Sequence, residues 1–272
     1  MDMTRVSTCS YPLREKDLDY TLDVIAAAGF KKVDLWGRMP HFSTDSEQLA
    51  PEDIEALCAK YGLQIANIGS YPGRLFASED PTEVQAELAE MVRTIDLAQR
   101  LGARSIRVMP GHAEDRALIE AIVPPFRKSA EYAASKGIYL GMENHQGSIA
   151  GHPDWARELC EKVGSKHFGV LYEPCNLMHG GVDYKEAFEV FGDWITHCHI
   201  KDFHIVDGKF TTTHLGDGEL DVPWVVDALN SRGYTGDFAL EYEVWDIEPV
   251  ETGLVKWYNY AEGCARRSDP GS

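Results

Sequence analysis

The sequence contains no hydrophobic run that approaches the roughly 20 residues needed to cross a bilayer, which argues against an integral membrane protein. Its first residues, MDMTRVSTCS, lack the pattern of a secretory signal peptide. The six cysteines are scattered and include no CxxC pair. In a chain of 272 residues this argues against a zinc finger or a disulfide framework, so we expect buried thiols and a cytoplasmic location.

Basic residues are in the minority. The chain has 26 Lys and Arg against 44 Asp and Glu, which gives a formal net charge of −18. A surface of this charge repels phosphate backbones and anionic lipid. We therefore predict neither a nucleic-acid partner nor a membrane partner, and the charge itself indicates a solvated acidic surface.

Short β-rich segments alternate with amphipathic helical segments along the whole chain. Strands are predicted at 5–11, 31–36, 64–70, 105–110, 138–144, 168–173, 195–202 and 237–243. Helices are predicted at 17–28, 51–61, 82–101, 115–136, 153–163, 184–191, 223–231 and 249–265. Glycines stand where five of these helices must end before a strand: Gly29, Gly62, Gly102, Gly137 and Gly233.

Strand and helix repeated about eight times imply parallel strands joined by right-handed crossovers. We predict a TIM-type (β/α)₈ barrel that forms one domain over residues 1–272. A doubly wound open sheet is the alternative. It is disfavoured because no GxGxxG or Walker loop follows an early strand.

Four consecutive predicted strands finish with a carboxylate or an imidazole. Active sites of barrels lie at the carboxyl ends of the strands, where these four side chains would meet. Alternation along each strand places the bulky apolar residues toward the helices and the polar ones inside. The converging residues are Glu143, Glu173, His199 and Glu241.

Three carboxylates inside a barrel repel one another unless a positive charge lies among them. A divalent cation resolves the conflict, so we predict one metal ion bound by Glu143, Glu173, His199 and Glu241. This oxygen-rich set with a single nitrogen favours Mn²⁺, with Mg²⁺, Co²⁺ and Zn²⁺ as alternatives. The competing interpretation, that these are surface acids paired with lysines, does not explain the matching register.

Five segments carry a resemblance to a known family. They are ENH at 143–145, YEPCNL at 172–177, HCHIKD at 197–202, LGDGE at 215–219 and LEYE at 240–243. In this order they resemble the xylose-isomerase-like TIM-barrel superfamily of sugar (phosphate) isomerases and epimerases. The resemblance implies one metal held by the four strand-end residues, with Glu143 and Glu241 as catalytic acid and base. Glu173 stands where the family most often has aspartate.

These groups allow proton transfer next to a carbonyl. A metal chelated by a carbonyl and its adjacent hydroxyl acidifies the carbon-bound proton. One carboxylate removes the proton to give a metal-stabilised enediolate, and its return to the same or the neighbouring carbon gives epimerisation or isomerisation. We predict a metal-dependent sugar isomerase or epimerase. The alternative is a lyase: a keto-inositol or keto-acid dehydratase, or an enzyme that cleaves 3-keto-glycosides by β-elimination.

Further side chains near the strand ends are predicted to bind a sugar or keto-sugar: Trp36, His112, His145, Asn176, His179 and Lys201. His197 lies deeper and is expected to be structural. A trinuclear-zinc DNA-repair nuclease of the same superfamily is disfavoured because Asn176 replaces one of its histidines. A non-catalytic barrel that binds a sugar stays open as an alternative. Assembly into a homo-oligomer or with a partner subunit also stays open.

Overall fold

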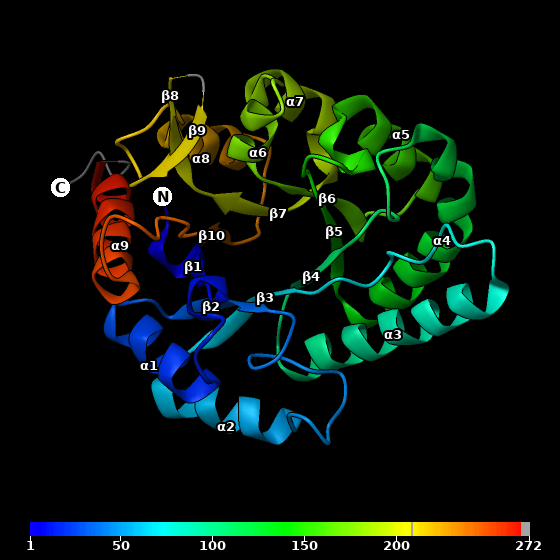
Figure 1. Ribbon diagram of the computed structural model, residues 1–272, viewed down its shortest axis with the longest axis horizontal. Coiled ribbons are helices and arrows are strands. Elements are labelled where there is room, and N and C mark those ends of the chain that lie inside the picture. Colours follow the sequence, from blue (N-terminus) through cyan, green and yellow to red (C-terminus); the bar gives the residue numbers. More distant parts are fainter. Residues whose placement is uncertain (208, 268–272) are drawn as a thin grey trace.

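The computed structural model describes residues 1–207 and 209–267. Eight parallel strands close into a barrel in the order β1-β10-β7-β6-β5-β4-β3-β2, which confirms the predicted TIM barrel (Figure 1). The strands are β1 Val6–Cys9, β2 Lys32–Trp36, β3 Gln64–Gly69, β4 Ser105–Val108, β5 Tyr139–Glu143, β6 Phe168–Tyr172, β7 Ile195–Ile200 and β10 Phe238–Leu240. Each overlaps a predicted strand and is shorter than it.

The predicted helices form a ring around the barrel (Figure 1). They are α1 Leu18–Ala27, α2 Pro51–Tyr61, α3 Pro81–Arg100, α4 Ile119–Lys136, α5 Pro153–Val163, α7 Tyr184–Phe191, α8 Val222–Ser231 and α9 Val250–Arg267. Within the described residues, five short 3₁₀ helices lie in loops: Met3–Arg5, Tyr11–Leu13, Arg116–Leu118, Ile149–Gly151 and Gly192–Trp194. Gly62 and Gly137 end their helices with φ of 64° and 72°, a region that favours glycine.

The last helix, α9, packs on the barrel wall as predicted. Leu254 and Ala261 are fully buried and Trp257 is 1% exposed, at the helical spacing that marks the buried face. Burying an apolar side chain of the size of Leu254 stabilises the fold by about 1.5–3 kcal/mol. None of the described helices combines the length and the apolar character that a membrane span requires.

A short helix and a two-stranded hairpin were not predicted from the sequence. The short helix α6, Pro174–His179, directly follows β6, and an antiparallel hairpin of β8, Asp202–Val206, and β9, Lys209–Thr213, follows β7. The predicted strand at 195–202 was therefore too long, because β7 ends at Ile200 and Asp202 already belongs to the hairpin.

Asp202 explains why the HIKD and LGDGE segments occur together. Its carboxylate is fully buried and accepts backbone N–H groups from Gly216, Gly218 and Leu220 at 2.9–3.1 Å. A Cβ on Gly218 would lie 2.1 Å from Oδ1 of Asp202, so only glycine lets this backbone approach the carboxylate. The contact holds the segment after the hairpin against the end of β7.

Candidate active site

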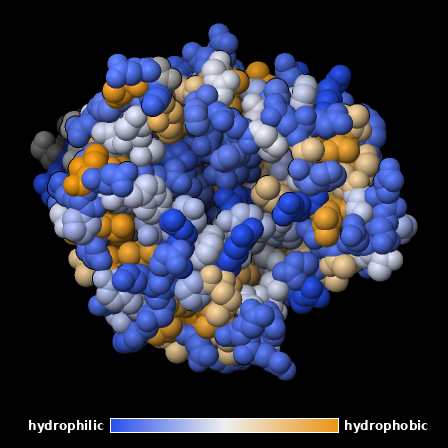
Figure 2. All heavy atoms as spheres, in the orientation of Figure 1, coloured by the Kyte–Doolittle hydropathy of each residue, from blue (hydrophilic) through white to orange (hydrophobic). Residues whose placement is uncertain are grey.

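A pocket of about 530 Å³ opens at the carboxyl ends of the strands. Figure 2 shows the molecule hollowed at its centre, with mainly hydrophilic residues around the hollow. The pocket is lined by side chains from most of the barrel strands, including Trp36, Arg107, Glu143, His145, Asn176, His179, His199, Lys201, Glu241 and Glu243. It is the place where a barrel of this kind carries its chemistry.

Three of the predicted metal ligands converge on one point of this pocket. Glu143 ends β5, His199 lies in β7, and Glu241 directly follows β10. The Nδ1 atom of His199 lies 3.7 Å from Oε1 of Glu143 and 3.5 Å from Oε1 of Glu241. One ligand atom from each residue lies within 4.8 Å of the other two. The structure therefore brings these three side chains together.

Both carboxylates of this group are held in the ionised form. Glu143 is 9% exposed and Glu241 is 8% exposed, and burial alone would raise the pKa of each. Arg107 and His199 outweigh burial at Glu143 and hold its pKa well below the usual value. Lys201 and His199 do the same at Glu241, whose pKa falls to about 2. The pocket thus presents two negative charges at neutral pH.

Arg107 is the principal countercharge of Glu143. It extends from β4, and its Nη1 lies 2.7 Å from Oε2 of Glu143. Two backbone carbonyls also accept from this guanidinium, Ser70 O at 3.2 Å and Gly69 O at 3.3 Å. Its Cζ lies 4.3 Å from the centre of the Tyr71 ring, a cation–π contact. The guanidinium is fixed on several sides and cannot swing away from the carboxylate without losing these contacts.

Lys201 is the countercharge of Glu241. Its Nζ lies 2.9 Å from Oε2 of Glu241 and 2.9 Å from Oε2 of Glu243. Burial would lower the pKa of Lys201, but the surrounding glutamates raise it well above the usual value. The ammonium therefore stays charged and joins two acids at the end of β10.

Glu173 is placed differently from the other three predicted ligands. Its two carboxylate oxygens accept the backbone N–H groups of Cys175 and Asn176, so Glu173 caps the start of α6. The side chain is fully buried, and burial raises its pKa to about 8. The structure does not bring Glu173 into the group formed by the other three ligands. Its role as a ligand stays a prediction.

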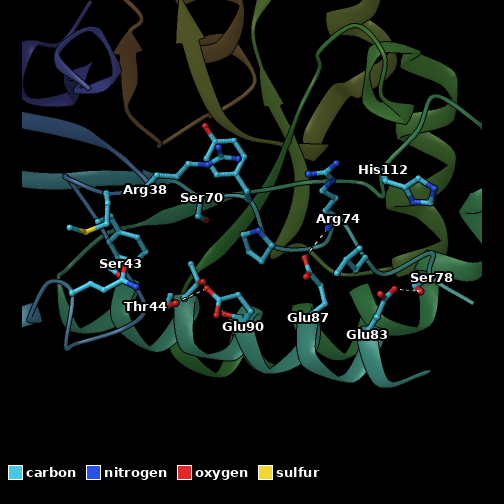
Figure 3. Close-up of a pocket in the computed structure, with 18 residues that line it drawn as sticks. Arg38, Ser43, Thr44, Ser70, Arg74, Ser78, Glu83, Glu87, Glu90 and His112 are labelled. Carbon is cyan, nitrogen blue, oxygen red and sulfur yellow. Dashed lines mark hydrogen bonds between the residues drawn. The ribbon is translucent and has the colours of Figure 1, made fainter. Parts of the chain in front are cut away.

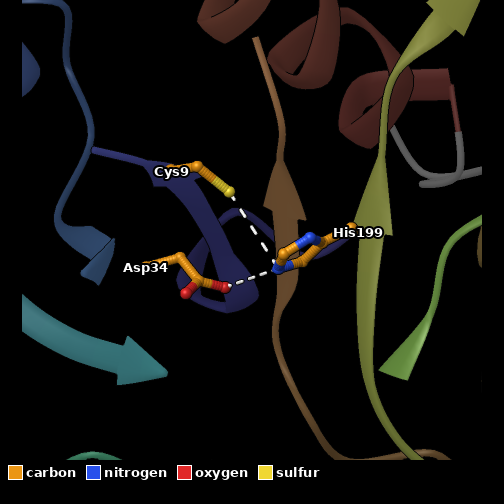
Figure 4. Close-up of side chains that lie close together, drawn as sticks. All are labelled: Cys9, Asp34 and His199. Carbon is orange, nitrogen blue, oxygen red and sulfur yellow. Dashed lines mark hydrogen bonds and ion pairs between the residues drawn. The ribbon is translucent and has the colours of Figure 1, made fainter. Parts of the chain in front are cut away.

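Asp34, on β2, orients His199 from the side opposite the carboxylate pair. Its Oδ2 lies 3.0 Å from Nε2 of His199 and 2.7 Å from Nε2 of His197 (Figure 4). The buried Cys9 thiol lies 4.0 Å from the same Nε2 atom, and burial raises its pKa to about 12. Both nitrogens of His199 therefore have defined surroundings, Asp34 on one side and two glutamates on the other.

The residues of this group fit a divalent cation. The buried Nδ1 atom of His199 has no hydrogen-bond partner among the residues described, although it points at two carboxylate oxygens. Metal–ligand bonds of about 2.0–2.2 Å place neighbouring ligand atoms roughly 3–3.5 Å apart. The distances from Nδ1 to the two carboxylates are close to this spacing. A protonated Nδ1 or a divalent cation satisfies the atom, and the two adjacent negative charges stabilise either one.

Five of the six predicted substrate-binding residues line the same pocket: Trp36, His145, Asn176, His179 and Lys201. Asn176 is 9% exposed, and its Nδ2 has no partner within the described chain. His179 stacks on the ring of Phe210, which the hairpin extends over the pocket, with ring centres 4.3 Å apart. Trp36 donates its indole N–H to the Tyr71 hydroxyl at 3.0 Å.

His112, the sixth predicted residue, lies elsewhere. It lines a neighbouring pocket of about 770 Å³ between α3 and the loops after β2, β3 and β4 (Figure 3). No member of the Glu143, His199 and Glu241 group lines that larger pocket. The structure does not bring His112 to the strand-end group, and a role in substrate binding stays a prediction.

Asp34 and Arg107 are the site residues that sequence reasoning missed. Each is a charged residue within a short strand that is otherwise largely apolar, VDLW and SIRV. A charge in the middle of a parallel barrel strand must face the interior, because the helix-facing side is apolar. That signal is present in the sequence and would have placed both side chains inside the barrel.

Comparison with known proteins agrees with this architecture. The family model described as xylose isomerase-like TIM barrel matches residues 22–257. An inosose dehydratase of Geobacillus thermodenitrificans (strain NG80-2) is 25% identical over 226 residues, which cover 71% of this chain and 74% of that protein.

Solved structures share the fold. A D-tagatose 3-epimerase-like protein superposes with a TM-score of 0.78 at 18% identity and covers 97% of both chains. A xylose isomerase-like TIM barrel protein from Mycobacterium smegmatis in complex with magnesium has a TM-score of 0.75 at 20% identity, covering 92% of this chain and 88% of that one. The family match extends over most of the sequence, and this chain belongs to the xylose isomerase-like TIM-barrel family.

Proposed function

We propose that this chain is a divalent-metal-dependent isomerase or epimerase that moves a proton next to the carbonyl group of a sugar or keto-sugar. The observation that carries the proposal is the unpartnered Nδ1 of His199, which faces two ionised carboxylates in a pocket of substrate size. Mn²⁺ suits this donor set best, with Mg²⁺, Co²⁺ and Zn²⁺ as alternatives. The magnesium complex of the Mycobacterium smegmatis protein supports a divalent ion.

The two glutamates can act from different sides of the substrate. In the barrel order, β10 and β5 are separated by β7 and β6, so Glu241 and Glu143 approach His199 from opposite directions. A divalent cation held by these residues would polarise the substrate carbonyl and lower the pKa of the adjacent carbon-bound proton. One carboxylate then removes that proton and the other returns one, which changes configuration without any loss of mass.

Other pocket residues would bind the hydroxyl groups. Asn176 Nδ2 is a buried donor without a partner, and Lys201 Nζ lies beside Glu241. Trp36 and Phe210 supply apolar walls, and His145 and His179 lie exposed at the rim. A small polyhydroxylated carbonyl compound matches this mixture of donors and aromatic surface. We also propose that the substrate is unphosphorylated, that the protein is cytoplasmic, and that Glu173 is a fourth metal ligand.

Dehydration by a lyase is the second candidate. It is favoured by the similarity to an inosose dehydratase and by the position of Lys201 between Glu241 and Glu243. A lyase uses the same proton removal but needs an acid beside the departing oxygen. Lys201, His145 or His179 would supply that proton.

Proton exchange in D₂O tests the proposal and separates its two outcomes. The protein is incubated with Mn²⁺ and a panel of ketoses, keto-inositols and 3-keto-sugars, and NMR follows deuterium at the carbon next to the carbonyl. We expect exchange with a product of unchanged heavy-atom composition. A product lighter by water or an aglycone establishes the lyase. Absence of exchange for every compound, with metal bound, contradicts the proposal.

A further inference from the structure

We infer that Asp34 is a positioning residue that fixes the tautomer of His199, and that Cys9, Asp34 and His199 do not form a second metal site. The inference rests on the proposed function, because it concerns how the chain presents His199 to a cation. Figure 4 shows the three side chains converging, and their possible ligand atoms lie within 4.8 Å of one another. Distance alone would therefore allow a metal at this second group.

The hydrogen bonds of Asp34 use both of its oxygens. Oδ2 lies 2.7 Å from Nε2 of His197 and 3.0 Å from Nε2 of His199. Oδ1 accepts from Nδ2 of Asn67 at 2.7 Å, and Asn67 Oδ1 in turn accepts from the Ser105 hydroxyl at 2.7 Å. The carboxylate is 3% exposed and is held by side chains of two other strands, β3 and β7. Oδ2, the oxygen that faces His199, already accepts from two histidines.

A carboxylate only accepts hydrogen bonds, so the facing nitrogens of both histidines must carry hydrogen. A neutral His199 with its hydrogen on Nε2 has its lone pair on Nδ1, the atom that faces Glu143 and Glu241. Carboxylates commonly fix metal-binding histidines in this way, and they raise the basicity of the ligating nitrogen. Asp34 therefore selects the tautomer that the strand-end metal site requires.

The same hydrogen bond excludes a cation at Cys9, Asp34 and His199. Binding there needs a lone pair on Nε2 of His199, which is the atom that donates to Asp34. A cation there would also compete with the buried Nε2–H group of His197 for Oδ2 of Asp34. The group of Cys9, Asp34 and His199 therefore supports the strand-end metal site and is not a separate metal site.

Asp34→Asn is the decisive variant because it keeps the size of the side chain. An amide has one accepting oxygen, so either Asn67 or the histidine pair loses its acceptor. An NH₂ group that faces His199 would require the lone pair on Nε2 and therefore the hydrogen on Nδ1. Titration calorimetry with Mn²⁺ should show affinity about 10- to 100-fold lower than in wild type. His197→Gln is the matched control, since His197 bonds the same oxygen but does not face the glutamates, and a smaller fall is expected.

Two further measurements need no folded Asp34 variant. The absorption spectrum of the Co²⁺-loaded wild type should lack a thiolate-to-cobalt band, and Cys9→Ser should leave spectrum and affinity unchanged. In the zinc-loaded wild type, ¹⁵N NMR should show hydrogen on Nε2 of His199.

The outcomes distinguish a failure of the role of Asp34 from a failure of the proposed function. A thiolate band that Cys9→Ser removes, hydrogen on Nδ1 of His199, or wild-type affinity in Asp34→Asn each overturns the role of Asp34. A wild type that binds no cation overturns the proposed function itself.

Discussion

Glu143→Gln and Glu241→Gln should each reduce deuterium exchange at the substrate carbon by about a hundredfold or more. Glutamine keeps the shape of the side chain but cannot accept the proton. It also removes one of the two negative charges that face Nδ1 of His199. Exchange is measured by NMR at saturating substrate and saturating Mn²⁺, so that weaker metal binding does not mimic a slower chemical step.

Glu243→Gln is the matched control for this pair. Glu243 lines the same pocket and shares Lys201 with Glu241, but it lies outside the group that converges on His199. A much smaller loss of exchange is expected. If Glu143→Gln or Glu241→Gln retained wild-type exchange while Glu243→Gln lost it, the acid and base would have been assigned to the wrong carboxylates.

Arg107→Met should lower the free energy of unfolding of the metal-free protein by about 3–5 kcal/mol, measured by urea denaturation at pH 7. The variant leaves the Glu143 carboxylate buried without its countercharge, which lies 2.7 Å away in the wild type. Removing one partner of a buried pair costs far more than the pair contributes, because the remaining charge is desolvated and uncompensated.

Three comparisons check the cause of this effect. Arg107→Lys keeps the charge and should lose less, and adding Glu143→Gln to Arg107→Met should restore much of the stability. Because Arg107 holds the pKa of Glu143 below its usual 4.5, the stabilisation is present above that pH and is lost as the pH falls. The difference between Arg107→Met and wild type should therefore shrink in acid. An Arg107→Met protein as stable as wild type at pH 7 would show that this ion pair has no such role.

The barrel could be predicted from local signals in the sequence. Gly62 and Gly137 end helices with backbone angles that other residues rarely adopt. Glu143 is the last residue of one short strand and His199 lies in another, and the alternation of polar and apolar residues along both strands is visible in the sequence. Such signals depend only on neighbouring residues. They fix the order of strands and helices and the end of the barrel at which the polar residues gather.

The remaining parts depend on contacts between distant segments. Asp34 and His199 are 165 residues apart, and no local pattern shows that they meet across the barrel. Glu173 was assigned by its position at a strand end, but Pro174 begins a helix whose N–H groups compete for the carboxylate. The Glu-Pro pair is a signal for a helix start, which the sequence reasoning did not use.

Metal titration of the purified protein tests the central claim most directly. Wild type stripped of metal with a chelator should bind about one equivalent of Mn²⁺ per chain. His199→Ala should lose this binding because it removes a nitrogen that faces both glutamates. Elemental analysis gives the number of metal ions per chain, and calorimetry gives the affinity for Mn²⁺. A wild type that binds no divalent cation and keeps full activity in EDTA would contradict the account.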